Sequence, residues 1–396
     1  MREDSKNMNG TTIPAQGLPA EQVHSMVENR LAGDLTFTSG HILGSMCSQP
    51  HPLSSAVFQQ QLAKNIGDPG LHPALAEMEE ETIKLLGNLF SNPQAVGSIV
   101  TGGTEANLLA MWTAKNSTPA DRREVVLPAT AHFSFEKAAS LMDLELVKIP
   151  VDADNRVKLE EYRRAIGPHT MALVGIAGTT GLGAVDPIDK ISDLALEHNL
   201  YLHIDAAFGG FVLPFLESAG YPHGQSPFDF SLQGVSSLTV DPHKMGRAPI
   251  PSGCIIYRAE DIAGSSTTHV SYLAGGKTRQ RTIVGTRSGA ATASVWATLQ
   301  HLGLDGFSRT VRECMQQTFF LKQQIDSMRG IETVIQPVMN VLGIRPVDYS
   351  SDELAGRLRQ RGYALSQFPG FLRITLMPHL SRTHLERFLD VLKAEL

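Results

Sequence analysis

Lys244 is the residue whose type and position most clearly suggest chemistry. A strand-like run, Ser237 to Val240, leads into Asp241-Pro242-His243-Lys244, and a second strand-like run, Cys254 to Tyr257, follows a turn rich in glycine and proline. In apolar surroundings between two strands, the ammonium form of a lysine is disfavoured, and the free amine can form a Schiff base with a carbonyl compound. A solvated lysine in a loop after a strand is the alternative interpretation.

Pyridoxal 5′-phosphate (PLP) is the commonest carbonyl cofactor of this kind, and it requires a carboxylate at its pyridine nitrogen, a phosphate site and a flat group over its ring. Asp205 lies in the apolar run YLHIDAAFGG, where a buried aspartate is costly unless it is paired, for example with a protonated pyridine nitrogen. Ala207 points to the same side of the strand and is small enough for a flat ring to lie close. Asp205 could equally cap a helix or bind a metal.

The phosphate site has a candidate in the run GSIVTGGTEANLLA, where the strand-like Ser98 to Val100 leads through Gly102-Gly103-Thr104 into a helix that begins at Glu105. Such a turn presents unpaired N–H groups and the positive end of the helix dipole to an anion. The same glycines could instead serve only a tight turn between strand and helix.

Three further side chains would complete the site. His132 follows a strand end and could stack on the ring, or it could be a structural histidine. Thr179 could donate to the ring hydroxyl or to Asp205, and His243 could donate to the phosphate.

The elements that must position these residues alternate regularly along the chain. The predicted strands are 98–100, 124–127, 145–149, 171–180, 201–210, 237–240 and 254–257, and the predicted helices are 74–90, 105–115, one from 134, 158–166 and 189–198. This alternation predicts an α/β fold with a mainly parallel sheet covered on both faces, in which ligands bind outside the carboxyl ends of the strands. His132, Thr179, Asp205 and Lys244 all fall at or just after such ends.

The segments after Arg258 do not continue this alternation of strands and helices. The polar, Gly-rich segment after Arg258 predicts a mobile loop. A long helical stretch, 290–328, then leads to strands 333–336, 341–345 and 372–376 and helices 351–361 and 382–395, which predicts a small C-terminal α+β domain.

Composition is that of a soluble enzyme, with 396 residues and a net charge of −6. No basic run or long apolar run occurs, so we expect neither a nucleic-acid nor a membrane partner. The three cysteines, Cys47, Cys254 and Cys314, have neither metal-binding nor C-x-x-C spacing, which predicts no metal site, reduced thiols and a cytoplasmic location.

The residues from TGGTEANLLA through AHFSFEKAA and HIDAAFGG to DPHKMGRAPIPSG resemble the group II PLP-dependent decarboxylases. GSMCSQPHP, NIGDPGL, IVGTRSGA and RITLMPHL are similar to the archaeal L-tyrosine/L-aspartate decarboxylase group within them. The resemblance implies PLP-dependent transferase fold type I, like aspartate aminotransferase, with a mainly parallel seven-stranded sheet in the large domain. We expect an N-terminal arm and helix at 1–60, a large PLP-binding domain at 61–309 and a small domain at 310–396.

The resemblance also implies a role for each matching residue. Lys244 would hold the cofactor and Asp205 its pyridine nitrogen, with His132 and Ala207 on either side of the ring and Thr179 beside it. The phosphate would be held by Gly103, Thr104 and His243, and by Gly285 and Thr286 of a neighbouring subunit. Tyr272, reaching across the interface of a homodimer, would protonate the substrate's α-carbon, and Arg373 would bind a substrate carboxylate unless it is a surface arginine.

The function implied is decarboxylation of an L-amino acid, L-tyrosine to tyramine and/or L-aspartate to β-alanine. The alternatives are a carbon–carbon lyase of the sphingosine-phosphate lyase type, an aminotransferase and a non-catalytic PLP-binding protein. Arg247 stands where relatives often have an apolar residue, and it could face the cleft and favour an acidic substrate or face solvent.

Overall fold

The computed structural model describes residues 13–221, 224 and 227–396, and the chain divides into two compact units, Met1–Thr36 and Phe37–Leu396. In the first unit, α1 (Ala20–Leu31) is a helix within the segment where an N-terminal arm and helix were expected, and none of its residues is buried.

The second unit is built around the predicted seven-stranded sheet, whose strand order is β1-β7-β6-β5-β4-β2-β3. The strands are β1 (Val96–Val100), β2 (Glu124–Pro128), β3 (Glu145–Ile149), β4 (Thr170–Ile176), β5 (Tyr201–Asp205), β6 (Val235–Val240) and β7 (Gly253–Tyr257). Strands β3, β2, β4, β5 and β6 run parallel, and β7 is antiparallel to both β6 and β1. The predicted α/β class with a mainly parallel sheet is confirmed. Strands β4, β5 and β7 are buried along their whole length because helices cover both faces of the sheet.

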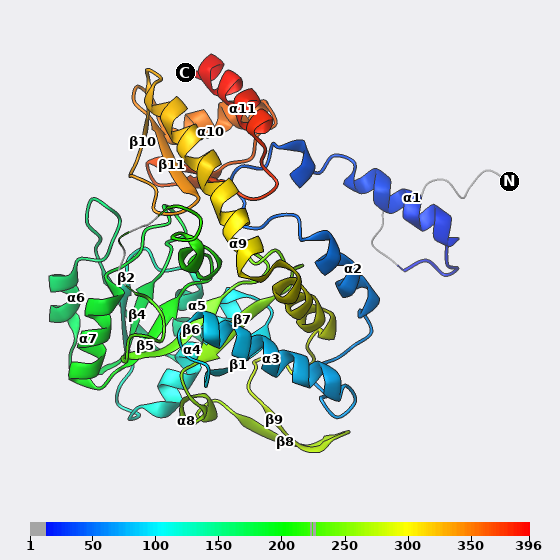
Figure 1. Ribbon diagram of the computed structural model, residues 1–396, viewed down its shortest axis with the longest axis vertical. Coiled ribbons are helices and arrows are strands. Elements are labelled where there is room, and N and C mark those ends of the chain that lie inside the picture. Colours follow the sequence, from blue (N-terminus) through cyan, green and yellow to red (C-terminus); the bar gives the residue numbers. More distant parts are fainter. Residues whose placement is uncertain (1–12, 222–223, 225–226) are drawn as a thin grey trace. The chain divides into compact units, whose positions relative to one another are not determined.

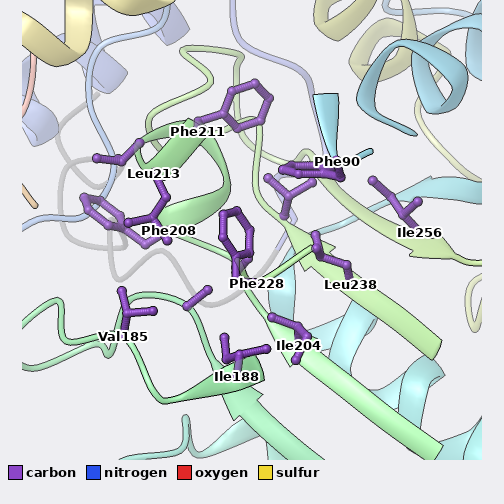
Figure 2. Packing of buried hydrophobic residues seen from close by; sticks show 14 of the residues in the cluster. Phe90, Val185, Ile188, Ile204, Phe208, Phe211, Leu213, Phe228, Leu238 and Ile256 are labelled. Atoms are coloured by element: carbon purple, nitrogen blue, oxygen red, sulfur yellow. The ribbon is translucent and has the colours of Figure 1, made fainter. Parts of the chain in front are cut away.

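Helices lie on both faces (Figure 1). They are α3 (Pro73–Leu89), α4 (Gly103–Ser117), α5 (Ser134–Met142), α6 (Leu159–Ala165), α7 (Ile188–His198) and α8 (Glu260–Gly264). Helix α2 (Pro52–Gln60) packs on α9 (Gly289–Asp326), and short 3-10 turns occur at Phe37–Ser39, Gly209–Phe211 and Leu213–Phe215. Successive residues of β2 enter different cores. Val125 and Leu127 belong to a core that also includes residues of α4, α5 and α8, while Val126 belongs to a core that also includes residues of α3, α6 and α7. Figure 2 shows the second of these cores, in which Phe90, Ile188, Ile204 and Leu238 come together from α3's end, α7, β5 and β6.

The C-terminal part has its own sheet and core. Helix α9 (Gly289–Asp326) packs on α2 and α3 at its beginning and on β10 near its end, and it bends at Gly303, whose φ is 56° (Figure 1). The antiparallel sheet has the order β10-β11-β13-β12, with β10 (Ile331–Thr333), β11 (Val341–Pro346), β12 (Ser366–Phe368) and β13 (Phe371–Thr375). Helices α10 (Ser351–Gln360) and α11 (Arg382–Glu395) enclose its core. Ser381 begins α11 through a capping box with His384.

Several segments differ from their predictions. Helices α2 and α8 were not predicted, and β4 and β5 end at Ile176 and Asp205 instead of at 180 and 210. The segment after Arg258 contains a hairpin, β8 (Thr268–Leu273) and β9 (Gly276–Gln280), rather than only a loop, because THVSYL alternates and a glycine turn follows it. Strand β10 lies at 331–333 instead of 333–336, and β12 was not predicted because three residues carry too little periodicity. No helix in the described part of the chain has both the length and the apolarity needed to cross a membrane.

Candidate active site

Lys244 lies in the connection between β6 and β7, at the carboxyl end of β6, and its Nζ is 3.0 Å from Asp241 Oδ2. The backbone N–H of Lys244 donates to Asp241 O (3.0 Å), so a tight turn places the two side chains together. The side chain of Asp241 is only 2% exposed and that of Lys244 is 20% exposed.

This ion pair corrects one expectation. Burial alone would lower the pKa of the Lys244 ammonium, but the carboxylates of Asp241 and Asp205 outweigh it and raise the pKa above its ordinary value. Lys244 is therefore an ammonium paired with a carboxylate, not a free amine in apolar surroundings.

Asp205 is the last residue of β5, the strand that pairs with β6, and it is 7% exposed. Its Oδ1 accepts from Ala207 N (3.1 Å) and its Oδ2 accepts from Asn107 Nδ2 (2.9 Å). Two N–H donors fix the plane of this carboxylate.

The glycine turn between β1 and α4 packs tightly against residues from β5 and β6. A Cβ on Gly103 would lie 2.8 Å from Asp241 Oδ2 and 3.2 Å from Ala207 Cβ, and one on Gly102 would lie 3.0 Å from His243 Cε1. No described side chain caps α4, so the N–H groups of its first turn remain for a ligand. Only glycine allows this close approach, which leaves space for an anion at the helix N-terminus.

His132 precedes α5, and its Nδ1 lies 3.0 Å from Ser134 Oγ. Burial lowers the pKa of His132, against the opposing effect of the Asp205 carboxylate. Thr179 is fully buried, and its hydroxyl oxygen accepts from Asn155 Nδ2 (3.1 Å) and Ala184 N (3.0 Å).

A cavity of about 320 Å³ joins these groups. It is lined by Met46, Thr101, Gly102, Gly103, Thr104, Asn107, Thr130, His132, Phe133, Ile176, Gly178, Thr180, Asp205, Ala207, Phe208, Asp241, His243 and Lys244. Of the predicted site residues, Gly103, Thr104, His132, Asp205, Ala207, His243 and Lys244 line it. Thr179 does not, although its neighbour Thr180 does.

The other predicted residues lie elsewhere. Tyr272 is on the hairpin strand β8 and is 86% exposed, and Gly285 and Thr286 are exposed in the segment that follows the hairpin. Arg373 is 6% exposed, and its guanidinium donates to Thr180 O (2.6 Å) and Gly44 O (2.5 Å).

Arg247 is absent from the cavity lining. Burial lowers the pKa of Arg247, and the carboxylate of Glu313 on α9 acts in the opposite direction. The structure therefore gives Arg247 neither of the two surroundings considered from the sequence.

Sequence reasoning missed several polar residues of the cavity: Asp241, Asn107 and the threonines Thr101, Thr130 and Thr180. Asp241 was visible as a carboxylate three residues before Lys244, and Asn107 as the one amide in the apolar run ANLLAMW.

The residues fit PLP on two structural observations. Asp241 Oδ1 and Thr130 Oγ1 are buried polar atoms without a hydrogen-bond partner among the described residues, and both residues line the cavity. Such atoms are normally satisfied by a ligand or water. The cradle at Gly102 and Gly103, with an ionised carboxylate and a lysine at the same sheet edge, matches the chemistry of a phosphorylated pyridine aldehyde.

Comparisons with known proteins agree with a PLP site. The chain is 44% identical over 381 residues to an L-aspartate decarboxylase of Thermococcus kodakarensis, covering 96% of this chain and 98% of the relative. It is 44% identical over 357 residues to a probable L-tyrosine/L-aspartate decarboxylase of Methanothermobacter thermautotrophicus, covering 90% and 97%.

Among solved structures, a sphingosine-1-phosphate lyase of Burkholderia pseudomallei has a TM-score of 0.89 at 25% identity, covering 97% of this chain and 92% of the lyase. A glutamate decarboxylase of Lactobacillus brevis has a TM-score of 0.87 at 21% identity, covering 97% and 93%, which shows the shared fold type I. The model of the pyridoxal-dependent decarboxylase conserved domain matches residues 3–344. The chain therefore belongs to the pyridoxal-dependent decarboxylase family, and it is a PLP-dependent amino-acid decarboxylase.

Proposed function

We propose that this decarboxylase converts L-aspartate to β-alanine, with L-tyrosine to tyramine as the second candidate. Support for L-aspartate comes from relatives at 42–44% identity that are named L-aspartate decarboxylases. Support for L-tyrosine comes from a second cavity of about 320 Å³, which shares Thr130, His132, Phe133 and Thr180 with the first and adds Phe368 and Phe371. These rings could pack against a phenol.

The observation that carries the assignment of residues is the meeting of Lys244, Asp241, Asp205 and His132 around one cavity. PLP, when bound, accepts the electrons that remain at the α-carbon after carbon dioxide leaves. Lys244 would bind the cofactor, and the Asp241 carboxylate would hold the lysine nitrogen in place. Asp205 would pair with the pyridine nitrogen.

The remaining roles concern orientation. His132 and Ala207 would enclose the ring and exclude water from its faces, with Thr179 beside it. Gly103, Thr104 and His243 would hold the phosphate.

Arg373 would bind a substrate carboxylate. Its Nε has no partner among the described residues, although its other nitrogens donate to backbone carbonyls. By holding that carboxylate so that its bond to the α-carbon is perpendicular to the ring, Arg373 would decide which bond of the substrate breaks.

We further propose that the enzyme is a homodimer whose sites lie at the interface. Tyr272 is 86% exposed and does not line the cavity of its own chain, which suits a proton donor for a neighbouring chain, with Gly285 and Thr286 at that chain's phosphate. The domain boundaries proposed are 1–60, 61–309 and 310–396, supported by the two separate sheets and by the bend of α9 at Gly303. Three free thiols suit a cytoplasmic location.

The test is to incubate the protein and PLP with an equimolar mixture of the common amino acids and to identify the amine formed by mass spectrometry. β-Alanine should appear, with or without tyramine, and a Lys244→Ala variant should form neither. A different amine would refute the substrate assignment. Release of an aldehyde from a phosphorylated sphingoid base, without any amine from amino acids, would favour the lyase.

A further inference from the structure

Asn107 is a buried amide in α4, and it is 1% exposed. Its Nδ2 donates to Asp205 Oδ2 (2.9 Å) and to Ser134 Oγ (2.9 Å). Its Oδ1 accepts from Thr239 Oγ1 (2.8 Å) and lies 3.0 Å from His203 Nε2. Both ends of the amide are thus engaged inside the protein, and rotating it would break several buried hydrogen bonds.

The direction of these hydrogen bonds follows from Asp205. An ionised carboxylate only accepts, so Asn107 must turn its NH₂ group toward Asp205 and its oxygen toward His203. Since an amide oxygen cannot donate, His203 Nε2 carries the ring proton. Burial lowers the pKa of His203 to about 4, so the ring is neutral at pH 7. Its Nδ1 then accepts from Ser237 Oγ, which is 2.8 Å away.

A second branch leads to the other face of the site. Ser134 Oγ receives a hydrogen bond from Asn107, so its own O–H is directed to His132 Nδ1 at 3.0 Å. The backbone N–H of Ser134 points to the same nitrogen at 3.3 Å. With two donors on Nδ1, the ring proton of His132 belongs on Nε2.

We propose that Asn107 is a positioning residue that couples Asp205 and His132: it supplies a donor to the carboxylate and, through Ser134, determines which nitrogen of the histidine carries the proton. His203 holds Asn107 in the orientation that both branches need. This inference rests on the roles proposed above for Asp205 at the pyridine nitrogen and His132 over the ring.

Cofactor binding tests the branch to Asp205. Asn107→Leu keeps the branching of the side chain at Cγ but replaces the amide oxygen and nitrogen by methyl groups. We expect it to raise the dissociation constant of PLP about tenfold to hundredfold, as measured by equilibrium dialysis, because a hydrogen bond to a charged group is lost. His203→Phe should also weaken PLP binding. His203→Gln, whose amide can donate to Asn107, should bind PLP with an affinity close to that of the wild type. The His203 pair decides the question if Asn107→Leu does not fold.

The pH dependence of kcat/KM tests the branch to His132. Ser134→Ala removes a donor to the neutral imidazole, so the pKa of His132 rises and the acidic limb of the profile should move up by about half a pH unit to one unit. PLP should bind to this variant as it does to the wild type. The charged groups that act on His132 are Asp205, Lys244, Asp241 and Lys137, and none of them is altered.

Ser54→Ala is the matched control. It removes an equally buried hydroxyl that is bonded to Ser294 O and Thr298, outside the cavity lining, and it should change neither measurement.

Asp205→Asn, measured in parallel, separates the two proposals. Wild-type PLP affinity in Asp205→Asn would refute the role of Asp205 and the network with it. If Asp205→Asn binds PLP more weakly than the wild type but Asn107→Leu binds it equally well, the network alone would be refuted. The same conclusion would follow if Asp205→Asn binds PLP more weakly and the two His203 variants have equal affinities for PLP. An unchanged pH profile in Ser134→Ala would refute the branch to His132.

Discussion

Replacing Asp241 by asparagine tests whether the buried ion pair with Lys244 stabilises the site. At 3.0 Å, two unit charges attract by about 5.5 kcal/mol at an effective dielectric constant of about 20, before desolvation is subtracted. Removing one partner of a buried pair typically costs about 3–5 kcal/mol. Lys244 is 20% exposed, and Asp205 remains as a second carboxylate nearby. We therefore expect Asp241→Asn to lose about 2–3 kcal/mol.

The assay is urea unfolding of the cofactor-free protein at pH 7, followed by circular dichroism. Lys244 has a folded-state pKa raised above its unfolded value, so its stabilising contribution is fully present at pH 7 and would be lost only as the pH rises through the folded-state pKa. The control is Glu136→Gln, which breaks an exposed ion pair with Lys148 and should have no measurable effect. If Asp241→Asn unfolds at the same urea concentration as the wild type, the ion pair does not stabilise the folded state and the reasoning fails.

Three further predictions concern the dimer, the phosphate cradle and the pH dependence of stability. Mixing inactive Tyr272→Phe with inactive Lys244→Ala subunits should recover about one quarter of wild-type activity, because half of the re-formed dimers would contain one intact composite site; no recovery would contradict a shared site. Gly103→Ala should weaken PLP binding at least about tenfold, since its Cβ would lie 2.8 Å from a carboxylate oxygen, and unchanged affinity would exclude this turn as the cradle. Burial raises the pKa of Asp186 to about 7, so the free energy of unfolding should fall as the pH rises from about 4 to 7. Burial lowers the pKa of His203 to about 4, so the contribution of His203 to the free energy of unfolding should rise over nearly the same pH range. The two slopes, each up to about 1.4 kcal/mol per pH unit, should nearly cancel; urea titrations should show a rising slope in Asp186→Asn and a falling slope in His203→Gln, and flat curves in both would contradict the assignment.

The order of elements in the large sheet could be predicted because its strands and helices alternate with clear periods. Six of the seven strands run in the same direction and only β7 is reversed, as expected for a mainly parallel sheet. His132, Asp205 and Lys244 lie at or just after strand ends around one cavity. The placement follows from a general property of such sheets: residues at carboxyl ends meet at one edge whatever their separation in sequence. The hairpin at β8 and β9 was missed because glycines and polar side chains mask its short alternation.

The chemistry of Lys244 could not be predicted in the same way. Its sequence neighbours suggest an apolar setting and a free amine, whereas the fold turns Asp241 back onto it at 3.0 Å and raises its pKa. The hydrogen-bond partners of Thr179 and Arg373 could not be predicted from the sequence either. Thr179 accepts from Asn155 and Ala184. Arg373 donates to the backbone oxygens of Thr180 and Gly44.

By itself, the sequence determined the class of fold, the cofactor and the residues at the strand ends, because these depend on local periodicity and on side-chain chemistry. Only the tertiary structure decided protonation and orientation. Asn107 and Asp205 are 98 positions apart, yet a single 2.9 Å hydrogen bond joins them inside the protein. Such bonds and the burial around them set where each proton resides, and neither can be read from residues that are neighbours in the chain.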